Sequence, residues 1–283
     1  MPFPPPSPPQ HIVDELISER APTLSGSPLW PLLRGPLYKL LDYRKARWMA
    51  DQVAPLSGAE ALDFASDLLR LDLEVVGAER IPRTGRLMVV INHPTGLADA
   101  VAVLDALKPV RPDLIFFANA DAMRVNPRMG EVVIPVEWVE AKRTRDRMRE
   151  TLLATRQVLE AERCLVIFPS GRLSRRQPDG RLADPPWAQS AVSLARRYGC
   201  PVVPIHVAGP FSALFHFFNR FSGELRDVTL FHELLNKQGR RFVLTVGGAI
   251  PAAALEGEAG EVTLRLKVHV ERGLADDPDR TFT

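Results

Sequence analysis

Continuous runs of apolar residues recur along the chain, and segments with helical spacing of apolar positions lie between them. The strongest runs span residues 87–91, 114–118, 164–168 and 202–207. Uninterrupted apolar runs of this length predict strands that are buried on both faces, as in parallel sheets covered by helices. Less apolar strands are predicted at residues 71–76, 131–136 and 241–246. Together these patterns predict an α/β fold with helices on both faces of one sheet.

The helices that cover this sheet are predicted from apolar spacing and from Pro and Gly at segment ends. They are expected at residues 11–20, 57–70, 100–107, 143–161 and 186–198, whereas 123–129 is expected to be a loop. We divide the chain into a proline-rich, disordered tail at 1–10, a helical segment at 11–70 and an α/β domain at 71–283.

Residues 28–50 carry apolar and aromatic side chains interspersed with arginines and lysines. A basic amphipathic helix with aromatic residues is a candidate for lying in a membrane interface. The same pattern also suits a helix that packs against its own domain, and the sequence leaves both interpretations open. Residues 211–221 hold five phenylalanines and are a second candidate for membrane contact.

Composition and charge exclude several classes of protein. Of the 283 residues, 46% are hydrophobic, which allows a large core. The 36 Lys and Arg against 34 Asp and Glu leave a net charge of +2, so the bulk charge does not favour nucleic acid as a partner. The two cysteines, Cys164 and Cys200, form no disulfide framework and are expected to be buried thiols in a reducing compartment. Neither a signal peptide nor an apolar window of about 18 residues is present, so we expect a cytoplasmic protein with only peripheral membrane contact.

Polar residues stand at the predicted carboxyl end of strand 87–91. Asn92 and His93 follow the strand, a turn comes next, and Asp99 precedes the helix at 100–107. Ligands of α/β sheets bind outside the carboxyl ends of strands. A histidine held by a carboxylate serves as a general base near neutral pH. Two plainer roles stay open, namely a structural His93 and an Asp99 that only caps the helix.

These residues resemble the first motif of the glycerolipid, or lysophosphatidic-acid-type, acyltransferases. Most of that family has four residues between the His and the Asp, whereas this chain has five, with Pro94 directly after His93. This variant looks like the hemolysin-like or ornithine-lipid-type branch. The resemblance covers about residues 70–255 and implies a mostly parallel mixed sheet flanked by helices. It also places a helix at 261–271, where the apolar alternation by itself would suit a strand.

The loop at residues 168–174, Phe-Pro-Ser-Gly-Arg-Leu-Ser, is similar to the third motif of that family, with Ser170 where the family has Glu. A glycine-containing turn with an arginine at a strand end suits an anion. The resemblance implies that Ser170, Gly171 and Arg172 bind substrate, with Arg172 on the anionic group of the acceptor. The N–H group of Gly171 is a candidate donor to the oxyanion.

The remaining motifs supply fewer site residues. Arg143 matches the arginine of the second motif, which contacts the acceptor, and Arg145 competes for that role. Residues 202–206 resemble the fourth motif, and His206 at its end is expected to be a core histidine. Asn92 is assigned to the substrate site from its place beside His93 in the first motif.

The resemblance implies an acyltransferase that moves a fatty acyl group from acyl-CoA or acyl carrier protein to the hydroxyl of a lysolipid, lysophosphatidate-like or lyso-ornithine-lipid-like. His93 takes the hydroxyl proton while Asp99 holds the imidazole, and no metal or other cofactor is expected. The expected partners are the lysolipid, the acyl donor and the inner face of a membrane. Two other functions stay open: a catalytically silent lipid-binding relative, and a hydrolase that passes the acyl group to water. The hydrolase is the less favoured, because the chain lacks a Gly-x-Ser-x-Gly elbow.

Overall fold

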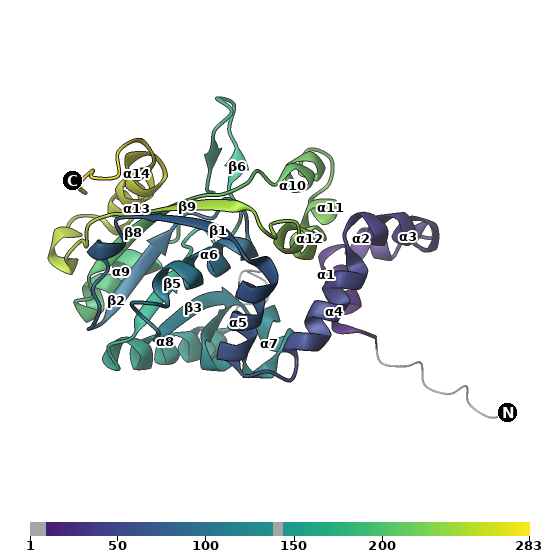
Figure 1. Cartoon of the computed structure of the whole chain (residues 1–283), viewed down its shortest axis with the longest axis horizontal. Helices are drawn as coiled ribbons and strands as arrows, with labels where there is room; N and C mark the ends of the chain where they lie inside the picture. Colours follow the sequence, from purple (N-terminus) through teal and green to yellow (C-terminus); the bar gives the residue numbers. More distant parts are fainter. Residues whose placement is uncertain (1–9, 138–143) are drawn as a thin grey trace.

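A seven-stranded sheet with the strand order β1-β9-β8-β2-β5-β3-β4 forms the centre of the molecule (Figure 1). The structure is a computed structural model that describes residues 10–137 and 144–283. Its strands are β1 (Asp72–Val76), β2 (Leu87–Ile91), β3 (Leu114–Asn119), β4 (Val133–Val136), β5 (Cys164–Ile167), β8 (Val202–Ala208) and β9 (Arg241–Val246). All neighbouring pairs are parallel except β8 and β9. The mostly parallel mixed sheet that the sequence predicted is therefore confirmed.

Helices cover both faces of this sheet. Successive side chains of a strand point to opposite faces, and Val89 and Val90 of β2 accordingly belong to two separate core clusters. The helices are α1 (Ile12–Arg20), α2 (Pro22–Ser25), α3 (Trp30–Leu40), α4 (Tyr43–Val53), α5 (Gly58–Leu69), α6 (Leu97–Leu107), α7 (Asp121–Val125), α8 (Arg145–Glu160), α9 (Ser190–Tyr198), α10 (Ala213–Phe218), α11 (Gly223–Asp227), α12 (Leu230–Leu235), α13 (Ala259–Val268) and α14 (Leu274–Asp276). One core cluster is closed mainly by α1, α4, α5, α6 and α12, and the other by α8, α9 and α13.

Three helical predictions need correction. The segment 28–50 is not one helix, because the chain turns between α3 and α4, where Asp42 adopts a left-handed conformation with φ of 53°. The loop expected at 123–129 is wrong: α7 and a 3₁₀ turn (Pro127–Glu131) occupy it, and the buried Asn126 side chain joins them to the carbonyl of Val53. The helix expected from residue 186 begins only at Ser190. The helix expected at 261–271 is confirmed as α13 and the π-helical turn that follows it.

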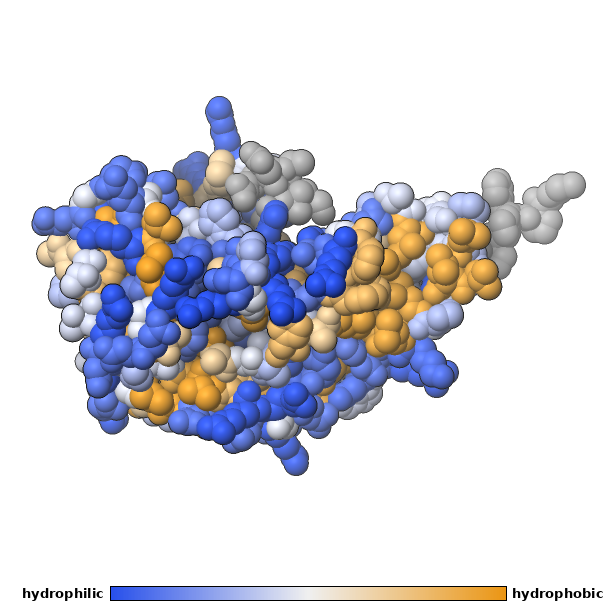
Figure 2. Space-filling model, turned by 90° about the horizontal axis from the view of Figure 1, so that it is seen from above, coloured by the Kyte–Doolittle hydropathy of each residue, from blue (hydrophilic) through white to orange (hydrophobic). Residues whose placement is uncertain are grey.

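The helices α1 to α4 extend to one side of the sheet (Figure 1). α1 and α4 nevertheless pack on the core through residues such as Val13 and Met49, whereas α3 has no buried residue. Large apolar side chains are exposed in and next to α3, and Figure 2 shows apolar atoms gathered on this side of the molecule. The proline-rich segment 1–9 lies outside the described residues.

Within the described ranges, no helix combines the length and the apolar character that crossing a membrane requires.

Candidate active site at the carboxyl end of β2

His93 and Asp99 form a close pair just beyond the carboxyl end of β2. The Nδ1 atom of His93 lies 2.9 Å from Oδ2 of Asp99. The imidazole packs against the ring of Phe168, whose centroid is 4.5 Å away. Phe168 is in reach because β2 and β5 are parallel neighbours, so the loops after them meet at one edge of the sheet. Nε2 of His93 has no hydrogen-bond partner among residues 10–137 and 144–283. The His93 side chain is 15% exposed, and that of Asp99 is fully buried.

Asp99 accepts several further hydrogen bonds from its own loop. Oδ1 accepts from the hydroxyl of Thr95 at 2.5 Å, and Oδ2 accepts from the backbone N–H groups of Thr95 and Gly96 at 2.9 and 3.0 Å. Asp99 is therefore not the N-cap that the sequence suggested, because α6 already begins at Leu97 and Asp99 is the third residue of its first turn. A carboxylate with four donors around it is fixed in orientation, and this orientation places one oxygen on the imidazole.

The turn between His93 and Asp99 depends on Gly96. Its φ of 89° lies in the region that favours glycine. A Cβ at this position would also lie 3.2 Å from the side chain of Leu173. The first and third motif loops therefore pack directly against each other. The backbone N–H of Ser174 donates to the carbonyl of His93 at 2.8 Å and continues this contact.

Asn92 is buried, and its side chain joins β2 to β8. Its Nδ2 donates to the carbonyl of Val207 at 3.0 Å, and its Oδ1 accepts from the N–H of Val207 at 2.7 Å. These contacts hold the strand end from which His93 follows. The contact of Asn92 with substrate stays a prediction, and both polar atoms of its side chain already have a protein partner.

The loop after β5 is a closed turn. The N–H of Gly171 donates to the carbonyl of Phe168 at 2.9 Å, so in this structure it already has a partner other than an oxyanion. The hydroxyl of Ser170 donates to the carbonyl of Arg172 at 2.8 Å, and the side chain of Arg172 is exposed. The substrate contacts of these three residues stay predictions.

Comparison with known proteins places this site in a family. A family profile described as Acyltransferase matches residues 72–208, which contain β1, both motif loops and β8. Two relatives are named lyso-glycine lipid O-acyltransferase. The one from Phocaeicola vulgatus is 26% identical over 201 residues, which are 69% of this chain and 70% of that protein. The one from Bacteroides thetaiotaomicron is 23% identical over 200 residues, 69% of this chain and 71% of that protein.

Residues 72–208 therefore match an acyltransferase domain. The family predicted from the motifs, the glycerolipid-type acyltransferases, is thereby confirmed. Among solved structures, the crystal structure of a 1-acyl-sn-glycerophosphate acyltransferase from Thermotoga maritima is 16% identical, with a TM-score of 0.49, and covers 94% of this chain and 100% of that chain.

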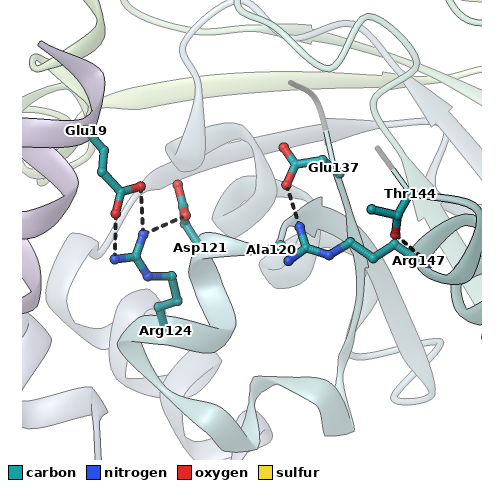
Figure 3. Close-up of a pocket in the computed structure, with 7 residues that line it drawn as sticks. All are labelled: Glu19, Ala120, Asp121, Arg124, Glu137, Thr144 and Arg147. Carbon is teal, nitrogen blue, oxygen red and sulfur yellow. Dashed lines mark hydrogen bonds and ion pairs between the residues drawn. The ribbon is translucent and has the colours of Figure 1, made fainter. Parts of the chain in front are cut away.

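A pocket of about 470 Å³ lies at the β3–β4 side of this acyltransferase (Figure 3). Figure 3 shows its charged side chains turned toward one another in pairs. Arg124, from α7, contacts Glu19 of α1, and Arg147, from α8, contacts Glu137 at 3.1 Å. Each arginine of this pocket is therefore compensated by a carboxylate. The predicted Arg143 lies outside the described residues, and its competitor Arg145 is the exposed first residue of α8.

A second pocket, of about 680 Å³, lies between α10 and the hairpin of β6 (Arg175–Arg176) and β7 (Leu182–Ala183). It combines apolar side chains such as Phe211 with exposed Arg176 and Arg220. Neither arginine pairs with an Asp or Glu in the part of the chain that the structure describes. Its lining residue Arg176 belongs to β6, which follows the loop at 168–174 in the chain.

Arg175 stands at the start of β6, between this pocket and the active-site loop. Its guanidinium lies 4.8 Å from the centroid of the Phe215 ring and donates to the carbonyl of Leu173. Burial, followed by repulsion from Arg226, lowers the pKa of Arg175 to about 10. His206 is held as a core histidine, with Nδ1 3.0 Å from the carbonyl of Val270, and burial lowers its pKa.

Sequence reasoning missed several residues of the site: Thr95, Ser174, Arg175 and Asp184. Thr95 lies inside the first motif, and its hydroxyl, four residues before Asp99, was a signal that could have been used. Ser174 closes the third motif, but its backbone contact with His93 depends on the packing of two loops. Nothing in the local sequence marks Asp184, which returns to the site through the β6–β7 hairpin.

Proposed function

We propose that this acyltransferase transfers a fatty acyl group from a thioester donor to the hydroxyl of a lysolipid. The observation that carries the proposal is the pair of His93 and Asp99, 2.9 Å apart, with Nε2 of His93 left for a substrate. The names of the two relatives support a lysolipid as acceptor. Because glycine carries a carboxylate, we further propose an acceptor with an anionic head group of the amino-acid-lipid type.

The proposed reaction needs one proton carrier. Asp99 holds the tautomer with the proton on Nδ1, so Nε2 removes the proton of the acceptor hydroxyl as its oxygen attacks the thioester carbonyl. The C–S bond then breaks, and the imidazolium returns the proton to the leaving thiolate. Asp99 stabilises the imidazolium while it exists. The oxygen of the acceptor attacks directly, so no acyl-enzyme forms, and the proposal invokes no metal or other cofactor.

We place the anionic head group of the acceptor at the pocket between α10 and the β6–β7 hairpin. Arg176 and Arg220 line it without a carboxylate partner among the described residues, whereas Arg124 and Arg147 of the other pocket are both paired. A free arginine binds a carboxylate or phosphate more strongly than one that is already compensated. Arg172, Ser170, Gly171 and Arg143 stay proposed contributors to substrate binding. The acyl donor, acyl-CoA or acyl carrier protein, is left open.

We propose peripheral attachment to the inner face of a membrane. α3 supports it, because this helix has no buried residue and exposes Leu32 to 74%. Phe217 and Phe221 are exposed near α11, and Glu224 of α11 caps α2 through the N–H of Leu24. The two apolar regions therefore lie on neighbouring elements (Figure 1). Exposed Arg34 and Lys39 on α3 suit an anionic lipid surface.

Thiol release from purified protein tests the proposed function. The protein is incubated with an acyl thioester, either acyl-CoA or acyl carrier protein, with and without a lyso-glycine-type lipid. We expect release that depends on the lysolipid, together with formation of the diacylated product. Release without an acceptor would instead identify a hydrolase, and release with neither donor would favour a lipid-binding relative without turnover.

A further inference from the structure

We propose that Asp184 is a positioning residue for acyl transfer, because its carboxylate holds the main chain of His93 in place. The inference rests on the proposed function of His93 and extends it to a second carboxylate. Asp184 follows β7 and is only 6% exposed. It is separated from His93 by 91 residues of sequence. The hairpin of β6 and β7 brings it back beneath the active-site loop.

Three donors from three segments converge on the carboxylate of Asp184. Oδ1 accepts from the backbone N–H of His93 at 3.1 Å and from the hydroxyl of Ser174 at 2.5 Å. Oδ2 accepts from the indole N–H of Trp187 at 2.9 Å. Asp184 thereby joins the end of β2, the end of the third motif loop and the segment before α9.

The backbone of His93 is held on both sides. Its N–H donates to Asp184, and its carbonyl accepts from the N–H of Ser174 at 2.8 Å. Asp99 holds the imidazole separately. The two carboxylates therefore have separate roles, since Asp99 fixes the ring and Asp184 fixes the peptide that carries the ring. A displacement of about 1 Å in a reacting group costs about 100-fold in rate.

The position of Asp184 is itself fixed by the C-terminal part of the chain. Its backbone N–H donates to Oε1 of Glu271 at 2.6 Å, and Oε2 of Glu271 accepts from Lys267 at 2.5 Å. No Lys or Arg pairs with the Asp184 carboxylate in residues 10–137 and 144–283. Burial of a carboxylate that has only neutral donors costs free energy of folding. If this position served stability alone, an apolar residue would stabilise the fold more than Asp184 does.

The test compares Asp184→Asn with Trp187→Phe in the full-length chain. Asparagine keeps the size of the side chain, but its amide oxygen is uncharged and therefore a weaker acceptor for the N–H of His93 and the hydroxyl of Ser174. Its NH₂ group cannot accept from the other side, so the side chain is also no longer held in the same orientation. We expect kcat to fall by about tenfold to 100-fold, while KM for the lysolipid and for the thioester changes by less than about twofold.

Trp187→Phe is the control, because it removes the donor to Oδ2 and leaves the contacts with His93 and Ser174. It should lower the melting temperature, yet keep kcat within about twofold of wild type.

The inference would be overturned if Asp184→Asn kept its kcat, or if it raised KM for the lysolipid at constant kcat. It would also be overturned if both variants lost kcat in proportion to their loss of stability. Should Asp184→Asn fail to fold, Asp184→Ser replaces it, because the shorter side chain withdraws the acceptor from the N–H of His93 without leaving a buried charge; an unchanged kcat then contradicts the proposal. His93→Ala serves as reference: full activity of that variant refutes the proposed function, whereas an inactive His93→Ala beside an active Asp184→Asn refutes only the role of Asp184.

Discussion

One carboxylate, that of Asp99, serves both the first turn of α6 and the imidazole of His93. Because Asp99 is the third residue of the helix, it reaches back to the N–H groups of Thr95 and Gly96. A serine is too short to make those contacts from the same position. The stabilising and the catalytic contribution of Asp99 are therefore separated best by asparagine, which keeps the length and one acceptor oxygen.

We predict that Asp99→Asn loses turnover by about 100-fold to 10,000-fold, because an amide neither fixes the Nδ1–H tautomer nor stabilises an imidazolium. Its melting temperature should fall by only a few degrees, since one oxygen still accepts from the loop. Steady-state kinetics and thermal unfolding measure both effects. The double variant with His93→Ala should be little worse than either single variant, because the two residues act as a unit. Near-normal turnover of Asp99→Asn would reduce Asp99 to a structural residue.

Arg176 and Arg220 are predicted to bind the anionic group of the acceptor. Replacement of either by Ala should raise KM for the lysolipid by about tenfold, the value of one charge-assisted hydrogen bond, and leave kcat nearly unchanged. Arg156→Ala is the matched control, because Arg156 is an exposed arginine of α8 that pairs with Glu160 and lines neither pocket. Arg172→Ala, in the loop that the sequence singled out, is measured alongside. Equal KM values for Arg176→Ala, Arg220→Ala and the control would remove this pocket as the acceptor site.

At the residue scale, the sequence predicted contacts within one loop and missed contacts between loops. His93 and Asp99 are six residues apart, and a strand, a turn and a helix bring such residues together almost independently of the rest of the fold. Asp184 reaches His93 only after the β6–β7 hairpin has formed, and no periodicity marks that return. The N–H of Gly171 had been assigned from its motif position, and its closed turn with Phe168 became visible only in the structure.

At the element scale, the two interpretations that the sequence left open for residues 28–50 apply to different helices. Packing against the protein itself describes α4, and the proposed membrane contact concerns α3. α4 packs on the core through Ala46, Met49 and Ala50, whereas α3 contacts it only through partly buried side chains such as Leu37 and Tyr38. Aromatic residues of this segment are used mainly for packing within the protein: the rings of Tyr38 and Tyr43 stack, with centroids 4.0 Å apart, and both hydroxyls donate to Asp14. The proposed membrane contact therefore rests on the exposed leucines of α3 rather than on these aromatic rings.

We predict that Leu32→Asp weakens binding to anionic vesicles by at least about tenfold, because burial of a leucine side chain contributes about 1.5–3 kcal/mol and an acidic group is repelled by the lipid. The control is Leu152→Asp, since Leu152 is an exposed leucine, at 51%, on α8. Sedimentation with vesicles at low and high salt gives both affinities. If the two variants and the wild type sediment alike, α3 is not the attachment site.

The strands were easier to predict than the helix boundaries. The five residues of β2 are all buried, and an uninterrupted apolar run indicates a strand that is buried on both faces. The helix starts depended on tertiary contacts. Before α9 begins at Ser190, the indole of Trp187 is bonded to Asp184 and the N–H of Ala188 donates to the carbonyl of Pro169. Asn126, whose side chain reaches the carbonyls of Val53 and Leu56, likewise organises a segment that looks like a loop in sequence.

At the scale of the whole molecule, three buried or half-buried histidines make the stability of the fold depend on pH. Burial lowers the pKa of His206, His216 and His269. The unfolded chain therefore binds protons more readily than the native protein once the pH falls below about 6.5, and stability present above that pH is lost as the pH decreases. Glu271, whose pKa burial raises, acts in the opposite direction.

We predict that the free energy of unfolding, measured with urea, decreases between about pH 7.5 and about pH 5.5. Since several groups contribute, the decisive comparison is with His206→Gln, which removes one titrating ring and retains an amide able to donate to the carbonyl of Val270. The slope with pH should be shallower in this variant than in wild type. Identical slopes would show that His206 does not contribute to the pH dependence.

The most direct test of a His93-based acyl transfer is the lysolipid-dependent release of thiol by wild type and by His93→Gln, measured side by side at saturating substrates. Glutamine fills much of the space beside Phe168, so both proteins should melt at similar temperatures. We predict that the variant loses about 100-fold to 10,000-fold in kcat, the contribution of a positioned general base. A folded His93→Gln variant that transfers the acyl group to the lysolipid at close to the wild-type rate would contradict the proposed function.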